Sequence, residues 1–155
     1  MRLRCIPGAL VLAALPACSM LGGADENWTE RNLTQAPPRR EILSYCQRAL
    51  AQAGYPAPVV DEAGSQAQSE WRNELQPFGG YGHRYRATLQ VKLLEGGVTQ
   101  LRARVEAQSN AELARPLDPI YADWEDAPDD ETRSRLLLQH LLSLLETSGV
   151  ARSER

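Results

Sequence analysis

The sequence has few of the residues that metal sites, disulfide scaffolds and catalytic triads require. Its 155 residues include three cysteines, two histidines and a single lysine, Lys92. The cysteines and histidines show no metal-ligand spacing, so we expect no metal site. The formal net charge is −3 at pH 7. This argues against nucleic acid as a partner, because proteins that bind nucleic acids present a basic surface.

No arrangement typical of an active site appears either. A serine hydrolase brings a serine, a histidine and a carboxylate together, but no GxSxG motif frames a nucleophile here. His83 lies in a Gly-rich segment, and His140 lies among leucines. Cys46 falls on the apolar side of an expected helix, where a thiol packs as a small hydrophobe. We therefore expect a protein that binds and does not catalyse, and that uses no cofactor.

Long hydrophobic runs are missing as well. The apolar run Cys5–Leu15 is interrupted by Pro7 and Gly8, and it is well short of the ~20 apolar residues that a transmembrane helix needs. Two arginines precede it. A positively charged start followed by a short apolar stretch is typical of a secretory leader.

The leader runs directly into Leu15-Pro16-Ala17-Cys18. This tetrapeptide resembles the lipobox of bacterial lipoproteins, in which Leu, two small residues and Cys end the signal peptide. Pro16 departs from the usual Ala, Ser or Thr. The resemblance implies that residues 1–17 are removed and that Cys18 becomes the acylated, palmitate-bearing N-terminus. With Cys18 acylated, Cys46 has no partner in the mature chain, so no disulfide framework is expected.

The residue after the lipobox bears on localisation. In the sorting rule of enterobacterial lipoproteins, Ser19 after the acylated cysteine implies the outer membrane, with the protein facing the periplasm. Residues 18–38 are expected to form the lipidated N-terminus and a flexible tether, because they are polar and contain Gly22-Gly23 and Pro37-Pro38. Residues 39–149 are expected to form one domain, and residues 150–155 a polar tail.

Hydrophobic periodicity predicts two helices and a long hairpin in this domain. Apolar residues recur at helical spacing over residues 39–53 and again over residues 130–147, where leucines dominate. Residues 84–94 and 98–109 alternate apolar and polar residues around Gly96-Gly97, as two antiparallel strands with one buried face do. Short strands are expected around Val59 and Trp71, and residues 110–128 are expected to be irregular.

The expected fold class is therefore α+β. An antiparallel sheet should carry the N-terminal and the C-terminal helix on one face. This element order resembles that of BamC-like helix-grip envelope lipoproteins. The resemblance implies a non-enzymatic accessory of outer-membrane protein assembly, bound to an envelope protein. The alternative is a carrier of a lipophilic ligand, held in a cavity between sheet and helix.

One polar surface stands out as a candidate site. Alternation places four arginines on the outward side of the hairpin: Arg84, Arg86, Arg102 and Arg104. Trp71 and Arg72 are candidates to lie nearby. These cations are either solvated and neutralised by Glu106 and the acidic segment from Asp118 to Glu131, or they form a docking face for an acidic partner or an anionic saccharide.

Overall fold

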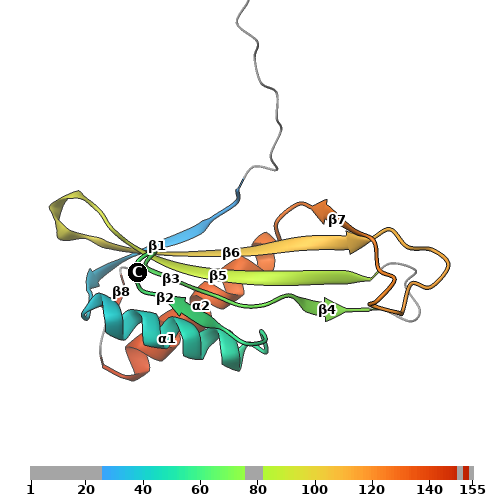
Figure 1. Ribbon diagram of the computed structural model, residues 1–155. Helices are drawn as coiled ribbons and strands as arrows, with labels where there is room; N and C mark the ends of the chain where they lie inside the picture. The colour runs from blue at the N-terminus through green and yellow to red at the C-terminus, as the bar shows by residue number, and fades with distance from the viewer. Residues whose placement is uncertain (1–25, 76–81, 150–151, 154–155) are drawn as a thin grey trace, which may run out of the picture.

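The computed structural model describes residues 26–75, 82–149 and 152–153. The expected signal peptide and Cys18 lie outside these residues. The described chain forms an antiparallel sheet with two helices on one face, which confirms the expected α+β class (Figure 1).

Helix α1 (Arg39–Gln52) forms where the apolar spacing predicts it. Pro38 precedes its first turn, and Gly54 follows with a φ of +79°, a left-handed conformation that suits glycine at a helix end. One side of the helix is buried and includes Ile42, Cys46 and Leu50. This side holds α1 against the sheet.

Helix α2 (Glu131–Thr147) begins at Asp130, whose side chain accepts a hydrogen bond from the backbone N–H of Arg133. This cap satisfies one of the free donors of the first turn. Leu137, Leu141 and Leu145 are buried. The two helices pack side by side on the same face of the sheet (Figure 1).

The hairpin of β5 (His83–Leu93) and β6 (Thr99–Asn110) forms the centre of the sheet, and its register runs from His83 opposite Ser109 to Leu93 opposite Thr99. Gly96 and Gly97 both adopt a positive φ in the connection, as the turn chemistry predicts. Leu89 is fully buried and Val91 nearly so, which confirms both as core residues.

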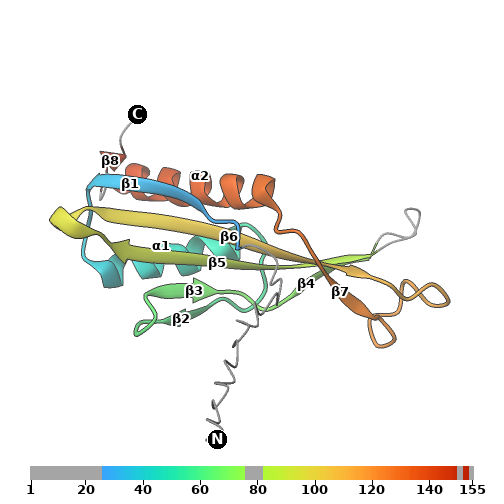
Figure 2. The same cartoon turned by 90° about the horizontal axis from the view of Figure 1, so that it is seen from above.

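Shorter strands extend the hairpin on both sides. Figure 2 shows the order β2-β3-β5-β6-β1-β8, with β4 pairing β5 and β7 pairing β6 beyond this path. Their bounds are β1 Thr29–Gln35, β2 Val59–Asp61, β3 Gln66–Gln68, β4 Arg72–Glu74, β7 Trp124–Ala127 and β8 Arg152–Ser153.

Three boundaries differ from the sequence-based expectation. The predicted tether, residues 18–38, contains β1, which pairs with β6 from Thr29 opposite Ala103 to Leu33 opposite Thr99. The segment expected to be irregular contains β7, and the expected tail contains β8. The domain therefore reaches from Glu26 to Ser153, and its first strand precedes the first helix.

The start of helix α2 fills a gap in the strand pairing along one edge of β6. Along the edge of β6 that faces away from β5, pairing with β1 covers residues 99–103 and pairing with β7 covers residues 107–110. Between them the buried Ser134 accepts a hydrogen bond from the N–H of Val105 at 2.9 Å, and the N–H of Asp130 donates to the Val105 carbonyl at 2.8 Å. The start of α2 thus satisfies backbone groups that no strand reaches.

Candidate functional site

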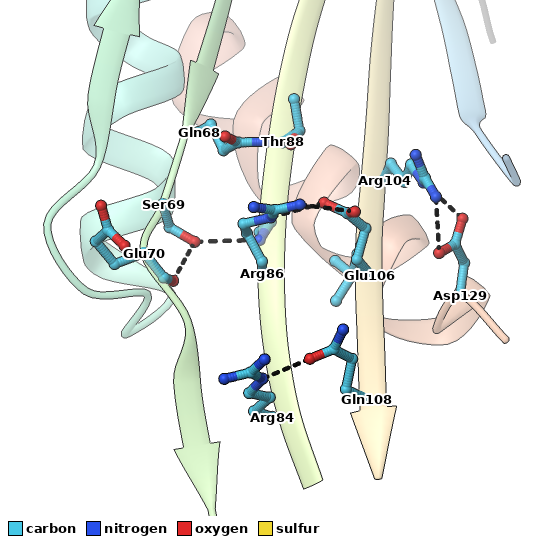
Figure 3. Close-up of polar contacts among 12 residues, drawn as sticks. Gln68, Ser69, Glu70, Arg84, Arg86, Thr88, Arg104, Glu106, Gln108 and Asp129 are labelled. Carbon is cyan, nitrogen blue, oxygen red and sulfur yellow. Dashed lines mark hydrogen bonds and ion pairs between the residues drawn. The ribbon is translucent and has the colours of Figure 1, made fainter. Parts of the chain in front are cut away.

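The helix-free face of the sheet carries the four candidate arginines. We call this surface the outer face; it is formed by the residues of β5 and β6 that alternate with the core residues (Figure 3). Its central members are Arg84, Arg86, Gln90, Arg102, Arg104, Glu106 and Gln108. All four arginines predicted to face outward do so.

Three of these arginines are neutralised by carboxylates. Arg86 forms two hydrogen bonds of 2.9 Å with Glu106, which lies directly opposite it in the register (Figure 3). These bonds raise the pKa of Arg86 above its ordinary value. Bidentate pairs of this kind are among the stronger polar contacts in proteins. The expected neutralisation by Glu106 is therefore confirmed.

Arg104 and Arg102 are neutralised from more distant parts of the chain. Arg104 Nε donates to Asp129 Oδ2 at 2.7 Å, and Arg102 Nε donates to Glu30 Oε1 at 2.6 Å. The side chains of the two arginines are only 16% and 15% exposed. Burial by itself lowers the pKa of Arg104, but its bonds and charge contact with Asp129 outweigh this and raise it. Both cations are built into the surface as structural partners.

Arg84 differs from the other three. Its Nε donates to Gln108 Oε1 at 2.6 Å (Figure 3). Within the described residues it forms no ion pair with a carboxylate. Burial and the nearby charge of Arg86 lower the pKa of Arg84 from its ordinary value, and the more distant carboxylate of Asp126 offsets this only in part. Among the described residues, it is the one outward arginine of the hairpin without an ion-pair partner.

Aromatic rings hold the Arg84 guanidinium on two sides. Its Cζ lies 4.6 Å from the ring centre of Trp71 and 4.7 Å from that of Trp124. Arg86 also lies over Trp71, at 4.8 Å. At these distances the ring electrons attract a cation. We call the arrangement of Trp71, Arg84 and Trp124 the tryptophan–arginine stack.

All three tryptophans of the sequence contact outer-face arginines, since Trp28 lies 4.4 Å from the Cζ of Arg102. Trp71 lies near this face as predicted, whereas Trp28 falls within the segment predicted to be a tether. The alternation of Trp28, Glu30 and Asn32 is the signal that could have identified an outward-facing strand. Arg72, the other neighbour considered, lies on the helix side, where its Cζ is 4.7 Å from the Tyr55 ring.

A second polar cluster lies on that helix side and links β4 to the start of α2. Arg133 donates to both carboxylate oxygens of Glu74, at 3.1 and 2.8 Å, and also to Asp130. Burial by itself raises the pKa of Glu74, but the bonds and charges of Arg133 and Arg72 outweigh it and lower the pKa. This cluster ties the long end of the hairpin to the helix layer, and its role is structural.

The thiol considered for catalysis is far from activated. Cys46 is completely buried, and burial raises the pKa of its thiol to about 12, so it is protonated at neutral pH. His140 contacts Gln52 at 3.2 Å on the helix side, whereas His83 opens β5. No group of three or more metal-ligating side chains occurs within residues 26–75, 82–149 and 152–153.

A cavity of about 450 Å³ lies at one end of the sheet, beside the start of α1. Its wall includes apolar side chains of β1, α1 and β5, among them Leu33, Ile42 and Val91. The space between sheet and helices is otherwise filled by fully buried side chains such as Leu89, Val105 and Leu138.

The comparisons with known proteins give no family for this chain, because neither the family models nor the curated proteins contain a match. In the part of the chain that the structure describes, no helix has the length and apolar character needed to cross a membrane.

Proposed function

We propose that this chain is a lipid-anchored lipoprotein of the bacterial envelope and that its domain is a non-enzymatic binding module. Its docking surface is the outer face. The leader, Leu15-Pro16-Ala17-Cys18 and Ser19 support an acylated N-terminus in the outer membrane, facing the periplasm. The resemblance to helix-grip envelope lipoproteins supports a role as an accessory of outer-membrane protein assembly.

The observation that carries the docking role is the tryptophan–arginine stack on the sheet face opposite to α1 and α2. An ordinary solvated sheet face needs only polar side chains. Tryptophan and arginine instead dominate the residues that contribute most to protein–protein binding energy. Their concentration around Arg84 supports a surface that binds a protein.

The start of the described chain lies on the same face. Glu26 pairs with Arg104 at 3.2 Å, and the N–H of Asn27 donates to Asp129 at 3.0 Å. Cys18 is eight residues before Glu26, a stretch that spans at most about 28 Å when fully extended. The anchor would therefore hold the outer face close to the membrane. A short linker of this kind raises the effective concentration of the domain near a membrane-bound partner.

A second candidate function, carriage of a lipophilic ligand, is supported by the cavity beside the start of α1. Its volume of about 450 Å³ lies within the range of about 300–1,000 Å³ that ligand pockets occupy. Native mass spectrometry of the protein purified from membranes tests this role, which requires a retained lipid besides the covalent anchor.

Site-specific photocrosslinking in cells tests the docking role. A photoreactive amino acid in place of Glu70, which is exposed and whose charge acts on Arg86, is expected to give a discrete crosslinked product in the membrane fraction. The same substitution at Gln139, which is exposed on α2, should give none. Crosslinks of equal yield at both positions, or only at Gln139, would contradict the proposal.

A further inference from the structure

We propose that Arg84 is the carboxylate-binding centre of a docking site for an acidic, partly apolar segment of a partner protein. The inference rests on the docking role of the outer face and adds the chemistry of the partner.

The Arg84 guanidinium is held ready to bind an anion. The two tryptophan rings fix its position, and Gln108 accepts a hydrogen bond from its Nε. Gln108 is itself oriented, because its Nε2 donates to Asp126 Oδ1 at 2.6 Å. Little conformational freedom is then lost when a ligand binds, which favours affinity.

The terminal nitrogens of this guanidinium remain available. No hydrogen bond or ion pair within the described residues uses Nη1 or Nη2 of Arg84. These two nitrogens form a planar fork that matches the two oxygens of a carboxylate. Arg86, Arg102 and Arg104 already have carboxylate partners. A carboxylate from a partner is therefore expected at Arg84.

Exposed apolar side chains also occur in the loop that leads into Trp124. Loop 111–123 joins β6 to β7 and ends beside Trp124, at the end of the sheet where Trp124 contacts Arg84 (Figure 2). It exposes Leu113, Leu117, Ile120 and Tyr121, the first and third at 75% and 85%. Four large apolar side chains in one exposed loop are available to contact a partner.

The residue before the loop, Asn110, fixes the loop conformation through side-chain hydrogen bonds. The side chain of Asn110, which is almost fully buried, accepts hydrogen bonds from the N–H groups of Glu112 and Asp123 and donates to the Pro116 carbonyl. The apolar side chains are thus presented by an ordered loop. A saccharide would leave them exposed, whereas a peptide with leucine- or isoleucine-like side chains beside an acidic residue would cover both parts of the site.

A peptide selection tests the proposal. A random 12-residue peptide library is selected on the full mature chain in detergent, with counterselection on Arg84→Gln. We expect enrichment of peptides that combine Asp or Glu with large apolar residues. A synthetic copy should bind the wild-type chain at least about tenfold more tightly than Arg84→Gln, since hydrogen bonds to charged groups contribute on this scale.

Two matched variants separate the site from general effects. Arg48→Gln removes the same charge from an exposed position on α1 and should leave the affinity unchanged. Asn73 lies directly opposite Arg84 in the register of β4 and β5. Asn73→Asp supplies Arg84 with a carboxylate from the same chain, so it should weaken peptide binding even though Arg84 and both tryptophans remain.

Three outcomes would overturn different parts of the proposal. A bulky label attached to Asn73→Cys serves to block the outer face. If the enriched peptides lack acidic residues and this label still prevents their binding, the carboxylate assignment is overturned and the docking role is retained. Peptides that bind regardless of Arg84→Gln and of that label would contradict the docking role too. Arg84-dependent binding of soluble anionic peptidoglycan fragments, without any peptide enrichment, would overturn the choice of a protein partner.

Discussion

Leu89→Ala is expected to lower the free energy of unfolding by about 3 kcal/mol, within the range measured for Leu→Ala in buried cores. Leu89 lies in the middle of β5 and is 0% exposed. The substitution removes apolar contacts and leaves a cavity, because the neighbouring strands and the helices packed on this face cannot close around the smaller side chain. Urea denaturation followed by circular dichroism measures the change.

Leu136→Ala is the matched control. It makes the same chemical change on α2 at a position that is 59% exposed, so its effect should stay within about 0.5 kcal/mol. Equal losses at Leu89 and Leu136, or a loss below about 1 kcal/mol at Leu89, would mean that the buried face of β5 is misassigned.

Cys18→Ser is expected to abolish acylation of the chain and the membrane anchoring that depends on it. Each buried methylene of an acyl chain contributes ~0.8 kcal/mol to membrane binding, so a multiply acylated residue anchors the chain firmly. Without a thiol no acyl group can be attached at this position, and the protein should remain unprocessed or be released. Fractionation of cells, followed by mass spectrometry of the N-terminal peptide, measures both outcomes.

Cys5→Ser provides the comparison, because Cys5 lies in the segment that is proposed to be cleaved off as the signal peptide. This variant should remain anchored, with an acylated N-terminus that begins at Cys18. An unmodified Cys18, or a mature N-terminus elsewhere, would refute the lipoprotein assignment while leaving the fold unaffected.

The elements with strong local patterns could be predicted from the sequence. The alternation around Gly96-Gly97 identified the hairpin, and the spacing of apolar residues in 39–53 and 130–147 identified both helices. In each case the buried face repeats over ten or more residues, so periodicity determines which side meets the core.

The remaining strands depend on their partners more than on their own residues. Strand β1 (TERNLTQ) buries Leu33 but has little apolar character elsewhere, and it lies between Gly-rich and Pro-rich segments that suggest a tether. Strand β3 has three residues, QAQ, and was not expected. These strands are formed by pairing with β6 and β5, which no local pattern reveals.

The candidate site was predictable only in part. Alternation placed the arginines on one face, but the partners of Arg102 and Arg104 come from positions 72 and 25 residues away. The tryptophans that contact Arg84 come from the segment before β4 and from β7. The pairing of distant strands therefore distinguishes Arg84 from the three neutralised arginines. From the sequence, all four were equally good candidates for a docking residue.

The accessibility of the outer face in the cell tests the central claim most directly. Asn73→Cys and Gln139→Cys place single exposed thiols on the outer face and on α2; the buried Cys46 should not react. Labelling with a bulky maleimide is compared between intact envelopes and purified protein. A surface docked to its partner predicts that Asn73→Cys is protected several-fold only in the envelope, with Gln139→Cys equally reactive in both. Equal reactivity of Asn73→Cys in both states would contradict the account.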